Sequence, residues 1–285
     1  MRGGIPGGRS LGLAVTITIA LFLPASFSAT GRAPALSIDT AHAPILIERD
    51  ADFTPENGVI AGNGTPVDPF VIAGWEMLLS GPPGIEIRNT SAYLVIRDVV
   101  LVGSFEGAYD SVILRNVTNA RVENITSDYN RIGVLLEAVR SAAVTGNQLR
   151  DRQAIRVSSS TNVTFARNEA SGGPNGVVQV LVVDSTRIDI DSNRIDTGYG
   201  ISIGADRARD LQIVNNTIRS YGDGITLDNV SDTSITSNDV SWLPDIGIWA
   251  YGFDVRSSGN VSLTANFFRG LDENRVDGSS NISLE

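Results

Sequence analysis

Aromatic and charged side chains recur together in a series of longer turns that separate short apolar runs. Four aromatic residues in or beside these turns could serve as apolar platforms for sugar rings: Tyr199, Tyr221, Trp242 and Trp249. The carboxylates and guanidinium groups next to them would supply planar hydrogen-bonding partners for sugar hydroxyls. The pattern therefore predicts a side that binds carbohydrate. The alternative is that turns are polar in any protein and an occasional aromatic residue covers the core.

Two of the turn carboxylates could do more than bind. Asp223 and Asp245 occupy similar turns in adjacent repeats, and hydrolysis of a glycosidic bond needs two carboxyl groups that face the same bond. The same oxygen atoms would suit calcium, but the sequence has no compact loop rich in such ligands. We therefore predict no cofactor, with a calcium ion between Asp223 and Asp245 as the alternative.

A third candidate set lies at residues 251–256. The tetrapeptide Tyr-Gly-Phe-Asp at 251–254 resembles the start of a motif in β-helix alginate epimerases, where Pro-His follows in place of Val255 and Arg256. The resemblance implies proton abstraction next to a sugar carboxylate, with Arg256 as the neutralising cation, Tyr251 as the proton relay and Asp254 beside them. The histidine is missing, and a match of four residues arises readily by chance. A non-catalytic protein is therefore our first expectation, and an enzyme is the alternative.

The elements that must position these residues are repeats. Apolar residues keep the frame apolar-x-apolar-x-x-Asn-x-apolar, and a version one residue shorter occurs twice. The predicted column is spaced 21 to 28 residues apart and comprises Asp98, Asn124, Asn147, Asn168, Asn193, Asn216, Asn238 and Asn266. A fixed period of this length indicates stacked repeats. Asparagine suits such a column because it tolerates the left-handed backbone of a tight corner, and because stacked amides bond to one another.

Each repeat is built from strands. Its runs are short, alternate with period two and favour Ile, Val and Thr, whereas no helical periodicity follows residue 35. Helical repeats are therefore excluded. Leucine-rich repeats would need a Leu-rich consensus with a helical half, and WD-type propellers would need a longer period. The sequence predicts an all-β fold, a parallel β-helix (solenoid) of about eight coils with an N-terminal cap.

The chain divides into four predicted segments. Residues 1–29 combine arginines, an apolar run at 11–23 and small residues, which is typical of a secretory signal and too short for a spanning helix. Residues 30–44 read as a linker, 45–79 as the N-terminal cap with the first strands, and 80–285 as the repeats. The last repeat stops in mid-coil, so we expect a missing C-terminal region or a partner chain over the open end. We predict a secreted or cell-surface protein without a membrane span once the signal is removed.

The net charge limits the classes of partner, and the cysteine content limits the covalent cross-links. All 22 basic residues are arginine, and the net charge of −10 excludes nucleic acid as a partner. Cysteine is absent, so the fold needs no disulfides. Nine Asn-x-Ser/Thr sequons predict glycosylation, although the repeat pattern itself would generate several: Asn63, Asn89, Asn116, Asn124, Asn162, Asn215, Asn229, Asn260 and Asn281.

The opening segment resembles a known family. Residues 47–53, 57–59, 62–65 and 68–76, with the coils from Gly84 onward, are similar to secreted archaeal NosD-like β-helix proteins. The resemblance covers roughly residues 45–285. It implies a right-handed parallel β-helix, discussed as a scaffold that binds or hydrolyses carbohydrate, and the family name implies copper delivery. The chain has one histidine (His42), no cysteine and, besides Met1, only Met77, so the usual copper ligands are scarce.

Three hypotheses follow. The first is a secreted scaffold that binds polysaccharide or a cell-surface glycan, as an adhesion or structural module. The second is a polysaccharide-active hydrolase or uronate epimerase/lyase that uses Asp223, Asp245, Tyr251, Asp254 and Arg256. The third is an accessory protein of a membrane metal or transport system.

Overall fold

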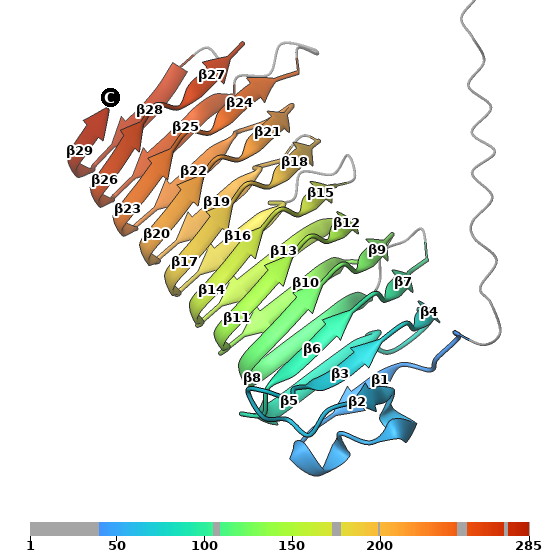
Figure 1. Cartoon of the computed structure of the whole chain (residues 1–285). Coiled ribbons are helices and arrows are strands. Elements are labelled where there is room, and N and C mark those ends of the chain that lie inside the picture. Colours follow the sequence, from blue (N-terminus) through green and yellow to red (C-terminus); the bar gives the residue numbers. More distant parts are fainter. Residues whose placement is uncertain are drawn as a thin grey trace, which may run out of the picture. The chain divides into compact units, whose positions relative to one another are not determined.

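Short parallel strands stack into three faces. The computed structural model describes residues 40–104, 109–172, 178–198, 200–243, 250–270 and 273–284. These residues form a parallel β-solenoid of about eight turns, and successive turns add one strand to each face (Figure 1). The predicted all-β solenoid is thereby confirmed. The predicted signal peptide and most of the linker, residues 1–39, lie outside the described residues.

Face A is a sheet of nine short strands. They are β4 (Glu76–Leu78), β7 (Val100–Val102), β9 (Thr126–Asp128), β12 (Gln148–Arg150), β15 (Glu169–Ser171), β18 (Arg194–Thr197), β21 (Thr217–Ser220), β24 (Asp239–Trp242) and β27 (Phe267–Arg269).

Faces B and C are joined through one long strand, β8 (Asp110–Glu123), which contributes to both. The other strands of face B are β1 (Ile45–Ile47), β5 (Ile85–Thr90), β10 (Ile132–Glu137), β13 (Gln153–Ser158), β16 (Val180–Val183), β19 (Ile203–Asp206), β22 (Ile225–Asp228), β25 (Tyr251–Arg256) and β28 (Glu273–Asp277). Those of face C are β3 (Phe70–Ala73), β6 (Leu94–Arg97), β11 (Arg140–Thr145), β14 (Thr161–Ala166), β17 (Thr186–Asp191), β20 (Arg209–Val214), β23 (Ser231–Thr236), β26 (Gly259–Thr264) and β29 (Ser280–Leu284).

The N-terminal segment departs from the repeat. Two 3-10 turns, η1 (Asp50–Asp52) and η2 (Pro55–Asn57), precede β2 (Val59–Ala61), which pairs antiparallel with β3. The rings of Phe53 and Phe70 stack at 4.3 Å, and the Trp75 indole N–H donates to the Gly58 carbonyl at 2.8 Å. These contacts hold an irregular segment against the first coil, which has no preceding coil to pair with.

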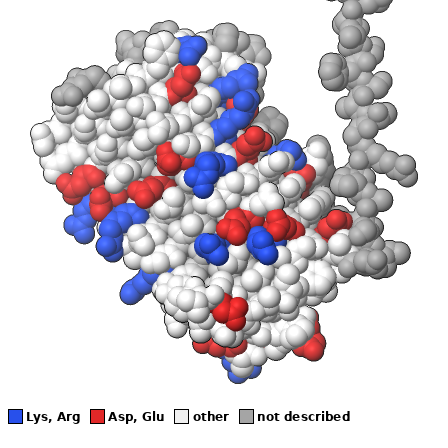
Figure 2. Space-filling view, viewed as in Figure 1, with Lys and Arg blue, Asp and Glu red and all other residues white. Residues whose placement is uncertain are grey.

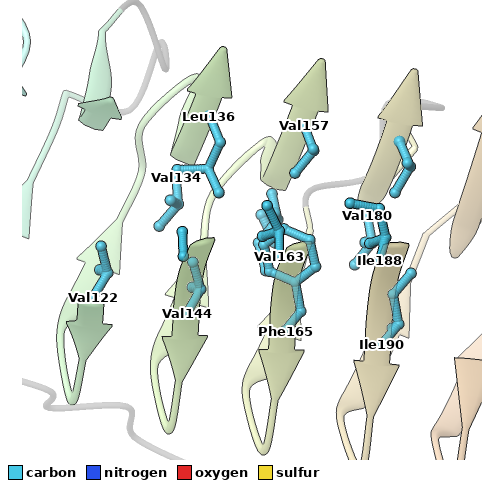
Figure 3. Packing of buried hydrophobic residues seen from close by; sticks show 14 of the residues in the cluster. Val122, Val134, Leu136, Val144, Val157, Val163, Phe165, Val180, Ile188 and Ile190 are labelled. Atoms are coloured by element: carbon cyan, nitrogen blue, oxygen red, sulfur yellow. The ribbon is translucent and has the colours of Figure 1, made fainter. Parts of the chain in front are cut away.

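The core lies between the three faces. Alternate residues of each strand point inward, as Figure 3 shows for Val134 and Leu136 on β10 and for Ile188 and Ile190 on β17. Ile188 and Ile190 are at most 1% exposed, whereas Asp189 between them lies on the outer side of the strand. The period of two in the sequence therefore places apolar residues in one continuous core along the coils.

A ladder of asparagine amides runs along the corner between faces C and A. Each amide donates to the next Oδ1 at 2.8 to 3.0 Å, and the ladder comprises Asn147, Asn168, Asn193, Asn216, Asn238 and Asn266. Each amide also donates to a carbonyl of the preceding coil, as Asn193 does to Phe165 at 2.9 Å. The same Oδ1 accepts a backbone N–H from the preceding ladder residue, as Asn216 does from Asn193 at 2.9 Å. The amides from Asn147 to Asn238 are thus paired although they are buried.

The predicted column is wrong at its first two positions. Asp98 and Asn124 have left-handed φ of 53° on the outer corner and pair with each other at 2.6 Å, outside the ladder. Val99 and Ile125 fill the inner position instead, and Asn147 Oδ1 accepts the Ile125 N–H at 2.9 Å. In later coils the left-handed residue directly precedes each ladder asparagine. The left-handed corner therefore explains Asp98 and Asn124, while hydrogen bonding between coils explains the ladder.

Corner geometry also accounts for the sequons. Eight of the nine sequon asparagines, all except Asn63, have left-handed φ between 51° and 58°. In most of them an inward apolar residue and an outward Ser or Thr follow, as in Asn162, Val163 and Thr164. Asparagine is favoured at such corners for its backbone alone. The sequons therefore follow from the fold, and glycosylation stays a prediction.

Candidate functional site

The longer turns all connect a strand of face A to the next strand of face B. We call the side where they meet face B the turn side. Three predicted residues of these turns lie outside the described residues: Tyr199, Asp245 and Trp249. The others can be placed: Tyr221, Asp223, Trp242, Tyr251, Asp254 and Arg256.

Asp254 is the centre of a compact charged cluster. It is fully buried on the outer side of β25, between the inward residues Phe253 and Val255. Its Oδ1 accepts from the Nε of Arg256 at 3.2 Å and from the Nε of Arg275 at 2.8 Å, and its Oδ2 accepts from an Nη2 of each. Since both oxygens already accept two charge-assisted hydrogen bonds, Asp254 is poorly suited to remove a proton from a substrate.

Tyr251 and Asp223 complete this Asp254 cluster. The guanidinium of Arg275 lies 4.5 Å from the centroid of the Tyr251 ring, and Asp223 Oδ1 accepts the Tyr251 backbone N–H at 2.9 Å. Burial raises the pKa of Asp223, against the lowering effect of the Tyr251 N–H, and the charge of Asp254 raises it further. Asp223 is therefore the carboxyl group of the cluster best placed to exchange a proton.

The Asp254 cluster combines predicted and unpredicted residues. The structure brings Asp223, Tyr251, Asp254 and Arg256 together and adds Arg275, which sequence reasoning missed. Arg275 lies directly opposite Asp254 in the register of β25 and β28. Its position one repeat after Asp254 was the signal that could have found it.

The described aromatic residues of the turn side bridge neighbouring coils. The Trp242 indole N–H donates to the Tyr221 carbonyl at 3.2 Å, and both side chains are partly exposed. Trp242 thus contacts the turn of the preceding coil while it keeps part of its ring open to solvent. This arrangement leaves a partial platform for a sugar ring.

A groove on the same side presents guanidinium groups over an apolar floor. This arginine groove has a volume of about 410 Å³ and is lined by Arg131, Ile132, Leu135, Glu137, Arg152, Gln153, Arg156 and Ser158. Ile132 and Leu135 form, with Ile113, a separate hydrophobic cluster on the outer side of face B. Arg152 and Arg156 are exposed, and no carboxylate of the described residues pairs with either. Sequence reasoning did not predict this groove.

Two acids lie close to the arginine groove. Asp110 is buried and accepts from Arg131 at 2.6 and 2.8 Å, which neutralises that arginine. Asp151 is 1% exposed, and its Oδ1 accepts the Asn130 N–H at 2.9 Å. The Oδ2 of Asp151 has no hydrogen-bond partner among the described residues and faces Gly133, where a Cβ would lie 2.5 Å away. Burial raises the pKa of Asp151 to about 7, although the Asn130 N–H lowers it.

The charged residues of this surface are otherwise interspersed. Figure 2 shows acidic and basic residues side by side rather than in patches of one sign. On face B, Glu86 lies 2.8 Å from Arg88 and 3.2 Å from Arg115, and Arg115 lies 3.0 Å from Glu137. The arginines of this row are thus neutralised by their neighbours, unlike Arg152 and Arg156.

Comparison with protein families gives one match. A family described as "Periplasmic copper-binding protein (NosD)" matches residues 86–284. The chain belongs to the NosD family. The resemblance noted in the sequence is therefore confirmed, while the archaeal origin stays a prediction. No curated protein matches the chain.

Solved structures similar to this NosD-family chain are β-helix proteins. The A-module of mannuronan C-5 epimerase AlgE6 from Azotobacter vinelandii has a TM-score of 0.52 and 13% identity, over 78% of this chain and 87% of that one. An alginate lyase from Paenibacillus sp. str. FPU-7 has a TM-score of 0.48 and 13% identity, over 85% and 99%. The Streptococcus pneumoniae surface adhesin PfbA has a TM-score of 0.44 and 9% identity, over 75% and 81%. At these identities the similarity concerns the fold alone.

The described residues of this NosD-family chain do not fit a copper site. They hold no group of three or more His, Cys, Asp or Glu side chains that could share a metal ion. His42 packs its ring 4.7 Å from Trp75, and Met77 is 1% exposed in the core. The one imidazole thus packs against an indole and the one described thioether is buried in the core, so neither is presented as a copper ligand. The calcium site proposed between Asp223 and Asp245 involves a residue outside the described part and stays a prediction.

Proposed function

We propose that this protein is a non-catalytic β-helix that binds polysaccharide along its turn side, as an adhesion or structural module outside the cytoplasm. The observation that carries the proposal is the arginine groove, where exposed guanidinium groups flank an apolar floor. Planar charged donors next to an apolar surface match the hydroxyl-rich edges and the apolar faces of sugar rings.

The state of Asp254 favours binding over catalysis. Asp254, the acid of the epimerase-like motif, accepts hydrogen bonds from Arg256 and Arg275, and Arg256, the candidate cation of that motif, donates to Asp254. The charge of Arg256 is therefore used within the fold and is not available to neutralise a sugar carboxylate. The turn-side aromatics Tyr221 and Trp242 fit the same interpretation, since partial exposure suits contact with a ligand.

Location outside the cytoplasm has two supports. Residues 1–29 have the composition of a secretory signal, and the matching family is described as periplasmic. Among the described residues, no helix has the length and apolar character to cross a membrane.

Binding without turnover is the test of this proposal. The purified protein would be titrated with acidic and neutral polysaccharides while reducing ends and ultraviolet-absorbing unsaturated products are assayed. We expect saturable binding that weakens in Trp242→Ala, with no product. Flat titrations across the whole panel would contradict the proposal, and so would product formation.

A second candidate function is a polysaccharide-active enzyme that uses Asp223. Burial raises the pKa of this carboxyl group, and it lies next to Tyr251 and Arg275. A proton-transfer group needs such an environment. Product formation that is lost in Asp223→Asn and retained in Trp242→Phe would support the enzyme and replace the first proposal.

A further inference from the structure

The strongest unassigned feature is the pair of arginines in the arginine groove. Arg131 and Arg152 occupy neighbouring coils in the same register, since the Gln153 N–H donates to the Arg131 carbonyl at 3.0 Å. Arg156 follows on β13, directly opposite Leu135 of β10. Three guanidinium groups therefore come from two adjacent coils, about 4.8 Å apart along the stack.

Two of these three guanidinium groups lack a counter-ion among the described residues. Arg131 is neutralised by Asp110, and the one acid of the groove, Glu137, lies 3.0 Å from Arg115 of the preceding coil. Arg152 and Arg156 have no carboxylate partner among the described residues. The groove therefore has a local excess of two positive charges in a chain whose net charge is −10. Such a site attracts a compact acidic group, while the rest of the surface repels a polyanion.

The apolar floor of the groove indicates which kind of group accompanies the acidic group of the ligand. Ile132 and Leu135 are 7% and 8% exposed and belong to a hydrophobic cluster separate from the main core, which contains Val134 and Leu136. Gln153 lies at the same level, and its amide donates to the Val178 carbonyl at 2.8 Å. An apolar floor with two cations at its edge fits a ring that carries one acidic substituent better than it fits a free inorganic anion.

We propose that the arginine groove binds an acidic sugar unit of a polysaccharide, with its carboxylate or sulfate between Arg152 and Arg156 and its ring against Ile132 and Leu135. This inference rests on the proposed function and specifies its ligand class. The volume of about 410 Å³ is within the usual range for small-ligand sites. The shared chemistry is one anionic group on a sugar ring, and carboxylate and sulfate ligands are separated by experiment.

The test uses calorimetric titration of the whole protein with three probes of matched length. These are oligogalacturonate for carboxylate, sulfated dextran fragments for sulfate and plain dextran fragments as the neutral ligand. The test variant is Arg152→Gln/Arg156→Gln. The control is Arg140→Gln/Arg167→Gln, which removes the same charge from two exposed arginines outside the groove. Unchanged urea midpoints would establish that both variants fold.

We expect at least one acidic probe to bind, with an affinity about tenfold or more lower in the groove variant and unchanged in the control. Raising the salt concentration should weaken the same binding. The preferred acidic probe identifies the acid. Equal affinities in both variants would overturn the groove assignment and leave the proposed function standing. Binding of the neutral probe as tight as that of the acidic ones would also overturn it. Failure of all probes would contradict the proposed function itself.

Discussion

The Asp254 cluster and the arginine groove lie on one row of face B and differ in charge balance, because the acids and arginines of the cluster pair with one another whereas Arg152 and Arg156 of the groove pair with no described carboxylate. Register partners lead from Arg156 through Leu181, Gly204 and Thr226 to Asp254, four strand spacings or about 19 Å along the stack. At one end a buried carboxylate takes hydrogen bonds from two arginines. At the other end Arg156 lies between Leu135 and Leu181 and has no counter-ion among the described residues.

This difference shows that the register partners of a charged side chain in the two adjacent coils decide its role. The side chain either pairs within the fold or keeps its charge available to a ligand. In a parallel solenoid each outward residue has one partner above and one below, fixed by register. Asp254 has Arg275 as a partner, so its charge is used within the fold. Arg156 has leucines on both sides, so its charge remains available to a ligand.

The largest expected effect concerns Asp151, close to the arginine groove. Its pKa rises from 3.8 to about 7 on folding, so folding favours the protonated form. The corresponding stability is fully present below pH 3.8 and is lost as the pH rises through about 7. A shift of about three units corresponds to about 4 kcal/mol. Urea unfolding at a series of pH values should therefore show Asp151→Asn gaining relative to the wild type as pH increases.

The exposed Glu169, which has no ion pair among the described residues, supplies the control for that experiment. Glu169→Gln should follow the wild type at every pH. A parallel pH dependence of Asp151→Asn and the wild type would mean that Asp151 is ionised and paired at neutral pH. The groove would then be less cationic than we infer.

Next in size is the loss of Asp254 from its cluster. Asp254→Ala leaves Arg256 and Arg275 facing each other without a carboxylate. Breaking a buried ion pair costs about 3–5 kcal/mol, and the lower end applies here because both arginines are partly exposed. Urea unfolding should show a loss of about 3 kcal/mol, against less than about 0.5 kcal/mol for the exposed Glu169→Ala.

A normal stability for Asp254→Ala, together with loss of any polysaccharide turnover, would reverse the comparison. Asp254 would then act on a substrate, and the closed appearance of the cluster would not describe its working state.

A smaller effect separates the two arginines of the Asp254 cluster. Arg275 contacts the Tyr251 ring and lowers the pKa of Asp223 by its charge, whereas Arg256 is absent from the groups that shift that pKa. Arg275→Gln should therefore raise the pKa of Asp223 further, and Arg256→Gln should leave it unchanged. Carboxyl titration by NMR would measure both, and stability should fall by about 1 kcal/mol in each variant. Equal pKa values of Asp223 in the two variants would contradict the assigned geometry.

Sequence reasoning found the coils and only part of the site. Alternation such as Ile188 and Ile190 around Asp189 predicted strands because one side of each strand must be buried. The first two ladder positions failed because asparagine suits both a left-handed corner, as at Asn124, and an inner ladder, as at Asn147. The left-handed corner and the ladder position are adjacent in the sequence, and the residue type alone does not show which of the two an asparagine occupies.

The arginine groove could not be predicted from the sequence for a related reason. Arg131 and Arg156 come from different coils and meet only through the register of β10 with β13. Whether an arginine is neutralised depends on its partner in the next coil, about 20 or more residues away in sequence. The repeats were predictable from local alternation, whereas the charge balance of each row needed the coordinates.

The smallest expected effect on stability comes from the arginine groove itself. Arg152→Gln/Arg156→Gln removes two exposed charges that pair with no carboxylate among the described residues. The free energy of unfolding should change by less than about 0.5 kcal/mol, since exposed charges without a fixed partner contribute little. The same urea experiment as for Asp254→Ala measures it. A loss comparable with that of Asp254→Ala would mean that Arg152 and Arg156 hold the fold together, and the groove would then have no charge available for a ligand.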